Sequence, residues 1–237
     1  MLNNILLSVF FKGFTLNFKG IDLKSIKEGF ADAPKHPLAI FSLIAIVLLG
    51  FLFIKLRKVK LNTKIITHIG VALALGTVLK MIKFYQMPNG GSVSLGSMVP
   101  IFLIALFYGP EIGILTGLLF GILDFLLGPY IMHPIQVLFD YPLAFSALGI
   151  AGYFKDKNKI QTILGVILAL FIRFLFHFIS GIIFYGSYAE PGQSAAAYSF
   201  WYNLSYIGPE GILCIIVLAF LPIKQIYKIL EKTSLSN

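Results

Sequence analysis

The feature that most constrains this chain is a series of apolar runs, several of them about as long as a membrane-spanning helix. Roughly 20 consecutive apolar residues are enough to cross the hydrocarbon layer of a bilayer. Charged residues make up only 12% of the 237 residues, about half the share of a typical soluble domain. Because the runs are continuous rather than alternating, they favour helices over a β-barrel. The sequence therefore predicts an all-α integral membrane helical bundle.

The runs predict six core transmembrane helices preceded by one extra N-terminal transmembrane helix. The predicted spans are 37–54, 65–82, 98–107, 112–127, 135–154, 160–185 and 195–221. We expect residues 1–60 to form an N-terminal arm with the extra helix, and residues 61–237 to form the six-helix domain. Within the arm, the mixed apolar and charged residues 1–36 favour a helix on the membrane surface over a poorly ordered segment, and they do not resemble a cleaved signal.

The positions of the basic residues predict the orientation. Three segments that must share one face hold eleven of the 19 Lys and Arg residues: 55–64, 155–159 and 224–232. The segments expected at the other face contain no Lys or Arg: 84–97, 128–134 and 186–194. Since basic loops stay in the cytoplasm, we expect a cytoplasmic C-terminus in a cell (plasma) membrane. The net charge of +9 is then explained by topology and does not call for a nucleic-acid partner.

Two stripes of small residues indicate close helix packing. The first recurs every four residues and is interpreted as structural: Gly109, Gly113, Gly117 and Gly121. The second consists of two interleaved pairs in the span 65–82: Gly70 with Ala74, and Ala72 with Gly76. For the second stripe, packing within the chain and packing against a partner subunit are both open.

Ionisable residues inside the spans are the candidates for a functional site. A charge at the bilayer centre costs roughly 2.5–3.5 kcal/mol on insertion scales, so such residues mark function by default. Arg173 and His177 are four residues apart and share a helix face, which Gly181 and Tyr185 continue. Asp140 lies about 8 Å into its span from the same outer end.

Further candidates at the outer ends of the spans are Tyr130, Tyr141, Tyr198 and Asn203. Tyr198 and Asn203 are about 140° apart around a helix, so we expect them to share a pocket only if the helix starts irregularly. A carboxylate, a histidine, tyrosines and an amide together favour recognition of a small polar ring. The aromatic faces add capacity to hold a cation.

Structural interpretations compete with each of these assignments. His177 is suited to an interhelical hydrogen bond, Asp140 to snorkelling, and the tyrosines to an interfacial belt. For Arg173, packing or snorkelling is favoured over ligand contact.

Two further acidic residues also have competing interpretations. Asp124 is interpreted as a helix-end residue rather than a pocket carboxylate. Near the middle of the last span, a kink at Pro209 would expose Glu210 to the cavity.

The main classes of enzyme lack support. The chain has no GxSxG, Walker phosphate loop or HExxH motif. The single cysteine, Cys214, excludes disulfide and Cys-cluster metal sites within one chain, and no His cluster has metal-ligand spacing. We therefore expect no catalytic residues, no metal and no cofactor.

Four ordered blocks carry a family resemblance: MPNGGSVSLGSMVPI at 87–101, HPIQVLFDYPLAF at 133–145, HFISGIIFYGSYA at 177–189 and AYSFWYNLSYIGPE at 197–210. With them the chain resembles the thiamine-specific substrate-binding components of energy-coupling-factor vitamin transporters. The blocks span nearly all of residues 65–222. The resemblance implies a six-helix membrane protein with one deep vitamin site near its outer face, covered by a lid at 84–97.

The resemblance also implies roles for single residues. Asp140 and Tyr141 match an acidic residue and a tyrosine that bind thiamine, and Tyr185 matches an aromatic stacking position. Further positions match a histidine, a tyrosine, an asparagine and a close-approach glycine: His177, Tyr198, Asn203 and Gly181. Some relatives carry Glu in place of Asp140, Trp in place of Tyr185 and Lys in place of Arg173, and the lid lacks the Trp and Glu that some relatives have.

The resemblance further implies uptake of thiamine powered by partners, namely a transmembrane coupling protein and two cytoplasmic ATPases. ATP hydrolysis by the partners would reorient this subunit and release the vitamin inside, and residues 70–76 would contact the coupling protein. Alternatives are a binding component for another vitamin or a thiamine precursor, a standalone membrane sensor or scaffold, and an intramembrane enzyme.

Overall fold

The computed structural model describes residues 37–57 and 59–232. The chain divides into two compact units, residues 1–43 and residues 44–237. The described helices and strands belong to the second unit, except that the first described helix begins within residues 37–43. The surface helix expected within residues 1–36 lies outside the described residues.

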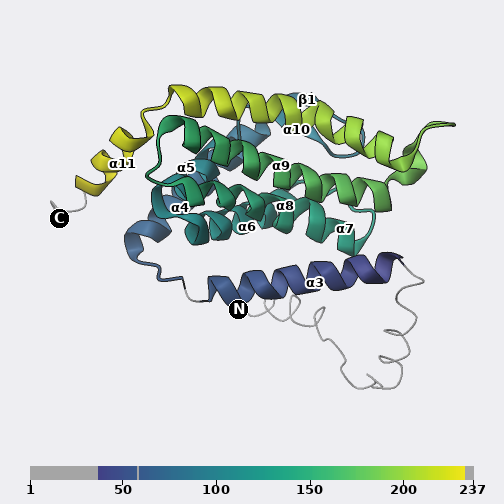
Figure 1. The fold of residues 1–237 in the computed structure, drawn as a ribbon, viewed down its shortest axis with the longest axis horizontal. Helices are drawn as coiled ribbons and strands as arrows, with labels where there is room; N and C mark the ends of the chain where they lie inside the picture. Colours follow the sequence, from purple (N-terminus) through teal and green to yellow (C-terminus); the bar gives the residue numbers. More distant parts are fainter. Residues whose placement is uncertain (1–36, 58, 233–237) are drawn as a thin grey trace, which may run out of the picture. The chain divides into compact units, whose positions relative to one another are not determined.

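Helices dominate the described chain (Figure 1). The first half contains α3 (Pro37–Leu56), α4 (Thr63–Met81), β1 (Lys83–Gln86), β2 (Ser92–Ser94), α5 (Val99–Tyr108) and α6 (Pro110–Leu127). The second half contains α7 (Pro134–Leu138), η2 (Phe139–Leu143), α8 (Ala144–Ser146), η3 (Ala147–Phe154), α9 (Lys159–Phe184), η4 (Gly186–Tyr188), α10 (Ala195–Phe220) and α11 (Ile223–Lys232).

Each of the six predicted core spans corresponds to a helical segment. Within the described residues, five of these segments are long and apolar enough to cross a membrane. The sixth, α5, has 10 residues and is therefore about 15 Å long. The prediction of an all-α integral membrane protein is confirmed, with one two-stranded hairpin as the exception to all-helical structure.

Polar caps fix where several helices begin. The Asn62 side chain accepts a hydrogen bond from the Ile65 amide (2.8 Å) at the start of α4. Asn158 and Gln161 form a reciprocal capping box at the start of α9, and Ser194 accepts from the Ala197 amide (3.2 Å) at the start of α10. Each cap satisfies amide groups that have no partner within the first helical turn.

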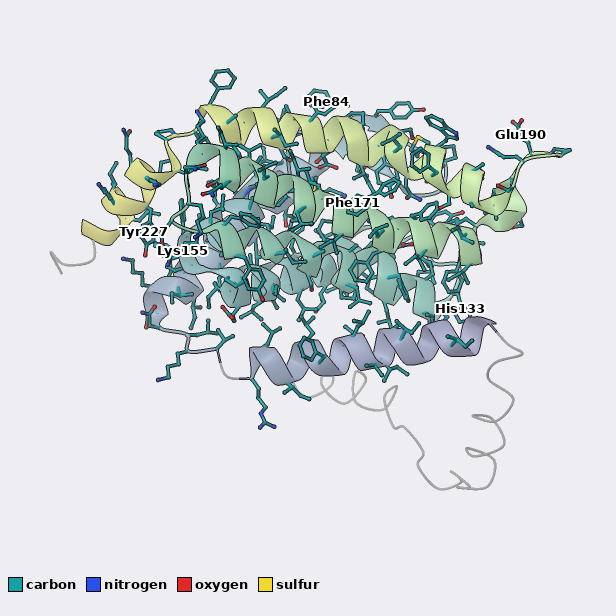
Figure 2. All side chains as sticks on the ribbon, viewed as in Figure 1. Phe84, His133, Lys155, Phe171, Glu190 and Tyr227 are labelled. Atoms are coloured by element: carbon teal, nitrogen blue, oxygen red, sulfur yellow. The ribbon has the colours of Figure 1, made fainter. Side chains whose placement is uncertain are left out.

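Large apolar side chains cover the outer faces of the long helices. Phe171 in α9 is 55% exposed (Figure 2), and Phe220 at the end of α10 is 85% exposed. Such exposure would be a liability in water but suits contact with lipid tails.

The segment Pro134–Phe154 is the least regular of the spans. It passes from α-helix into a π-helical turn at Phe139–Leu143 and ends as a 3-10 helix. Pro142 lies inside the π turn and has no amide hydrogen to donate, which explains the break in the regular pattern. The turn carries Asp140 and Tyr141, and π turns frequently occur at functional sites.

The glycine ridge of α6 packs against this irregular segment, as predicted. A Cβ atom on Gly117 would lie 2.1 Å from the Phe145 carbonyl oxygen, and one on Gly121 would lie 2.5 Å from that of Tyr141. Gly149 approaches from the other side, where a Cβ atom would lie 2.1 Å from the Ile114 nitrogen. Only glycine allows the two backbones to come this close.

The second small-residue stripe splits between two faces of α4. Ala72 and Gly76 are buried, and a Cβ atom on Gly76 would lie 2.9 Å from the Phe120 ring. Gly70 and Ala74 are exposed, and a Cβ atom on Gly70 would have nothing within 4 Å. One pair therefore packs within the chain and the other faces outward.

The Pro, Asn and Gly content of the outer segment 84–97 predicts a loop, and this prediction is wrong because the segment contains a β-hairpin. Strands β1 and β2 are antiparallel, with Gln86 opposite Ser92. The Met87 amide donates to the Gly91 carbonyl (2.6 Å), and Gly90 adopts a positive φ of 95°. An Asn-Gly pair between two strands is a strong hairpin signal, and it was available in the sequence.

Exposure of Glu210 to the cavity through a kink, which the sequence left possible, does not occur. Pro209 lies inside the continuous helix α10, and Glu210 is only 2% exposed. Its carboxylate accepts hydrogen bonds from the hydroxyls of Ser94 and Ser97, the latter at 2.8 Å. Two hydroxyl donors satisfy the buried carboxylate where it stands, and they tie α10 to the base of the hairpin.

We expect Gly117→Ala to destabilise the fold, because the added methyl group would collide with backbone that cannot move aside. Overpacking typically costs about 1–3 kcal/mol, which should lower the thermal unfolding temperature of the detergent-purified protein by several degrees. Gly70→Ala is the matched control, since its methyl group meets open space and alanine favours helix. Equal unfolding temperatures for the two variants would contradict the packing role of the ridge.

Candidate functional site

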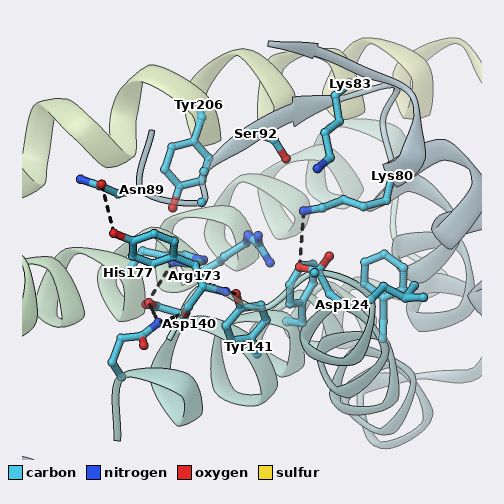
Figure 3. A pocket seen from close by; sticks show the side chains of 18 of the residues that line it. Lys80, Lys83, Asn89, Ser92, Asp124, Asp140, Tyr141, Arg173, His177 and Tyr206 are labelled. Atoms are coloured by element: carbon cyan, nitrogen blue, oxygen red, sulfur yellow. Dashed lines mark hydrogen bonds and ion pairs between the residues drawn. The ribbon is translucent and has the colours of Figure 1, made fainter. Parts of the chain in front are cut away.

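A cavity of about 160 Å³ lies at the end of the bundle where the loops contain no Lys or Arg. Side chains from α4, the hairpin, α6, the Pro134–Phe154 segment, α9 and α10 line it. Its ionisable lining residues are Lys80, Lys83, Asp124, Asp140, Arg173 and His177, besides its tyrosines. In Figure 3, Asp140 and His177 lie on one side of the cavity, Lys80 and Asp124 lie on the other, and Arg173 lies between them.

Asp140 is held by partners on both of its carboxylate oxygens. Oδ2 accepts from the Gln136 side-chain amide (2.6 Å) and from the Tyr185 hydroxyl (3.5 Å). Oδ1 lies 3.3 Å from His177 Nδ1. Gln136, which is 1% exposed, also donates to the Tyr130 carbonyl (3.2 Å). The carboxylate is therefore fixed in orientation while still bordering the cavity.

Three tyrosines form an aromatic wall beside this carboxylate. The rings of Tyr130 and Tyr185 are stacked, with centroids 6.0 Å apart and an interplanar angle of 24°. The Tyr141 hydroxyl accepts from the Tyr130 amide (2.8 Å), which ties the loop to the π turn. A hydrogen bond with Tyr188 raises the pKa of Tyr130 above its ordinary value.

Arg173 is buried, with 3% of its surface exposed, and its guanidinium lies 3.8 Å from the centroid of the Phe145 ring. This stacking is the kind of packing expected for Arg173, and the buried side chain also borders the cavity. Among the described residues, its Nε and Nη1 atoms have no hydrogen-bond partner, and neither does His177 Nε2. Buried polar groups without partners are costly, so these atoms are suited to bind a polar molecule in the cavity.

A smaller pocket of about 30 Å³ adjoins the cavity and shares Asp140, His177 and Tyr185 with it. Tyr198 and Asn203 both line this pocket, although α10 is a regular helix from Ala195 onward. The expectation that they need an irregular helix start is therefore wrong. The hairpin turn lies over this part of α10, and the Asn89 amide donates to the Tyr198 hydroxyl (3.0 Å), so the pocket extends to the Tyr198 side of the helix.

Asn203 and Gly181 join α9 to α10 next to the pocket. The Asn203 amide donates to the carbonyls of Ser199 (2.8 Å) and His177 (3.2 Å), and its oxygen accepts from the Tyr206 hydroxyl (2.8 Å). A Cβ atom on Gly181 would lie 2.1 Å from Ser199 Oγ. In this structure both residues position α9, which carries His177, against α10.

The structure thus distributes the nine predicted site residues over two adjoining spaces. Six line the larger cavity: Tyr130, Asp140, Tyr141, Arg173, His177 and Tyr185. Three line the smaller pocket: Gly181, Tyr198 and Asn203. Among the residues that the structure describes, no group of three or more His, Cys, Asp or Glu side chains could hold a metal ion.

Sequence reasoning missed the other polar side of the cavity. Asp124 lines it and pairs with Lys80 at 3.4 Å, so its interpretation as only a helix-end residue is wrong. Lys83, Asn89 and Tyr206 line the cavity as well. A charge inside an apolar run was the available signal for Asp124 and Lys80, but their pairing depends on the fold.

Comparisons with known proteins identify the family of the chain. The family model described as "Thiamine transporter protein" matches residues 66–230. Thiamine transporter ThiT of Bacillus subtilis is 40% identical over 169 residues, covering 65% of this chain and 88% of that protein. Thiamine transporter ThiT of Lacticaseibacillus paracasei is 28% identical over 140 residues, covering 52% of this chain and 70% of that protein.

A solved structure of ThiT from Listeria monocytogenes shares the fold, with a TM-score of 0.62 and 27% sequence identity. The match covers 70% of this chain and 96% of that one. Since the family model covers more than half of the chain, this multi-pass membrane protein belongs to the thiamine transporter protein family.

Proposed function

We propose that this chain is the thiamine-binding subunit of an uptake transporter and that thiamine binds in the cavity at the Asp140 end of the bundle. One observation carries the proposal: a fixed carboxylate, Asp140, stands beside the stacked rings of Tyr130 and Tyr185. Thiamine combines a cationic thiazolium with a flat aminopyrimidine. A carboxylate with aromatic walls suits the cation, and burial in low dielectric strengthens that attraction.

The unpartnered nitrogens suit the other half of the ligand. The ring nitrogens of an aminopyrimidine accept hydrogen bonds, and the guanidinium of Arg173 borders the cavity with unpartnered donors among the described residues. The amino group of the pyrimidine donates, and His177 Nε2 can accept from it when Nδ1 carries the hydrogen that faces Asp140. Such a ligand would relieve the cost of these orphaned groups. We therefore assign Arg173 and His177 to the pyrimidine and the Tyr130–Tyr185 wall to the thiazolium.

The hairpin turn is the lid of this proposed site. Asn89, Gly90 and Gly91 line the cavity, and the turn fits closely against its surroundings. A Cβ atom on Gly90 would lie 2.8 Å from the Tyr130 side chain, and one on Gly91 would lie 2.6 Å from the Tyr206 ring. The two glycines allow the turn to seat on these tyrosines, so the turn must lift for thiamine to enter and leave.

In this proposal the energy for release comes from other proteins, which fits a chain without a nucleotide-binding motif. The proposed partners are a transmembrane coupling protein and two cytoplasmic ATPases, which would reorient this subunit. The lysine-rich end of the bundle and the C-terminus then face the cytoplasm, and the cavity faces outward. No catalytic role is assigned to the chain itself.

Asp140→Asn tests the proposed site, because it removes the charge but keeps the shape of the side chain. We expect thiamine affinity to fall about 5- to 150-fold, which corresponds to about 1–3 kcal/mol for a lost buried polar interaction. Isothermal titration calorimetry with thiamine and with its separate pyrimidine and thiazole halves is the measurement. Asp156→Asn, at the exposed lysine-rich end, is the matched control and should bind normally.

An unchanged affinity in Asp140→Asn would overturn the site. If the wild-type protein binds the isolated pyrimidine or the isolated thiazole with the same affinity as intact thiamine, the protein is instead a precursor-binding component. Mass spectrometry of the molecule that co-purifies with the detergent-extracted protein gives an independent answer.

Two substitutions at Tyr185 distinguish the contribution of its aromatic ring to thiamine binding from that of its hydroxyl group. Tyr185→Phe keeps the aromatic face and removes only the long 3.5 Å hydrogen bond to Asp140, so most of the thiamine affinity should remain. Tyr185→Leu removes the face, and loss of a desolvated cation–π contact should weaken binding by about 2 kcal/mol. Similar losses in both variants, measured by calorimetry, would show that the hydroxyl and not the ring face recognises the ligand.

The exposed pair on α4 is the proposed contact with the coupling protein. Gly70→Leu with Ala74→Leu places two bulky side chains on that face, which should abolish the close approach that small residues permit. We expect the double variant to lose co-purification with the ATPase pair when co-expressed, while its thiamine affinity stays normal. Full retention of the ATPases would place the contact on another face.

A further inference from the structure

A second cavity, of about 510 Å³, lies at the other end of the bundle from the thiamine site, between the Phe154–Lys159 loop and α11. Along α9, Lys159 at this end is about 27 Å from His177, so the two cavities are distinct. Its floor is apolar and includes the buried side chains of Leu106, Phe107 and Leu218. We call this cavity with its rim the lysine groove.

Five lysines form the rim of the groove: Lys155, Lys157, Lys159, Lys224 and Lys228. The one acidic lining residue within the described chain is Asp156. The ion pairs found between described residues, Lys80–Asp124 and His177–Asp140, both lie at the other end. Five lysines against one aspartate leave the groove with an excess of positive charge, and no ion pair between described residues involves these lysines.

Helix α11 forms one side of the groove and is strongly amphipathic. Ile223, Ile226 and Tyr227 are half-buried, whereas Lys224 and Lys228 are one turn apart and exposed. Lys155 Nζ lies 5.5 Å from the centroid of the Tyr227 ring (Figure 2), which brings the loop and α11 together. A helix with an apolar face and a lysine face is suited to lie in the headgroup region of a membrane.

Two strongly exposed apolar side chains are next in sequence to residues that line the groove. Phe220, at the end of α10, is 85% exposed, and Ile160, in the first turn of α9, is 74% exposed. These outward-facing apolar side chains mark the edge of the lipid-contacting surface next to the lysines. A ligand of this groove must therefore combine an apolar part, an anionic head and access from within the bilayer.

We propose that the lysine groove binds an anionic phospholipid, with the phosphate among the lysines and the acyl chains along the apolar floor and the adjoining lipid-facing surface. If the lysines served only as the positive charge of a cytoplasmic loop, any exposed basic residue at this end would contribute equally to the binding of anionic lipid. If the groove is the binding site, removing its lysines should weaken lipid binding more than removing equally exposed basic residues elsewhere at the same end.

Native mass spectrometry of the detergent-purified full-length protein tests the proposal by titration with phosphatidylglycerol and, separately, with phosphatidylcholine of the same acyl chains. We expect stronger retention of phosphatidylglycerol. Lys224→Gln with Lys228→Gln should weaken its binding about 30-fold, which corresponds to about 2 kcal/mol at 1.4 kcal/mol per tenfold change and matches two basic residues near an anionic surface.

Arg57→Gln with Lys60→Gln is the matched control, since it removes the same charge from exposed positions outside the groove. It should change phosphatidylglycerol binding less than threefold. Lys155→Gln with Lys157→Gln is a second groove variant, in case the α11 variant does not fold. Size-exclusion profiles and unfolding temperatures check that each variant is intact.

Equal losses in the groove and control variants would overturn the proposal in favour of unspecific charge. Glycerol phosphate, which has the head without acyl chains, should not compete at millimolar concentration, and effective competition by it would make the groove a soluble-anion site. A protein dimer that the groove variant dissociates, with no lipid adduct, would show that a second copy of the chain covers this face.

Discussion

The contact between the backbones of α6 and the Pro134–Phe154 segment is the constraint on which the rest of the structure depends. At Gly117 and Gly121 the two chains approach so closely that a single methyl group would overlap a carbonyl oxygen. In a membrane, where lipid tails are as apolar as the side chains, such close packing is a main force that holds helices together. It fixes the π turn and therefore the position of Asp140.

The cost of polar groups in the membrane explains where the site lies. Most buried polar and charged side chains in the described core find partners within the fold: Gln136 donates to Asp140, and Glu210 accepts from two serine hydroxyls. The exceptions are nitrogens of Arg173 and His177 and the Ser180 hydroxyl. Two of these three residues border the cavity that Asp140 also borders. Because the fold satisfies its buried polar groups elsewhere, the unpartnered nitrogens at the cavity are available to a ligand that supplies the missing partners.

The sequence was informative about whatever depends on one element at a time. Helix positions follow from apolar runs, and the shared face of Arg173 and His177 follows from helical spacing, so the spans and the cavity residues on α9 were predictable. Contacts between elements that lie far apart in the sequence were not predictable. Ser94 and Ser97 satisfy Glu210 although more than 110 residues separate them from it. Asp124 in α6 pairs with Lys80 in α4, and both side chains line the cavity. The hairpin is different, because its Asn-Gly turn was readable and only the weak strand pattern obscured it.

The two cavities are coupled because both are lined by residues of α9 and α10. Helices α9 and α10 lie side by side (Figure 1), and each runs from the proposed thiamine site to the lysine groove. If this subunit reorients to release thiamine, as proposed, the movement must also displace the lysine groove. If anionic lipid is bound there, the lysines favour the orientation in which that end remains at the anionic surface, by about 1 kcal/mol for each basic residue that stays near it. The partners that drive release would have to supply this energy in addition to that of breaking the thiamine contacts, because a ligand shifts an orientation only by the difference of its affinities for the two states.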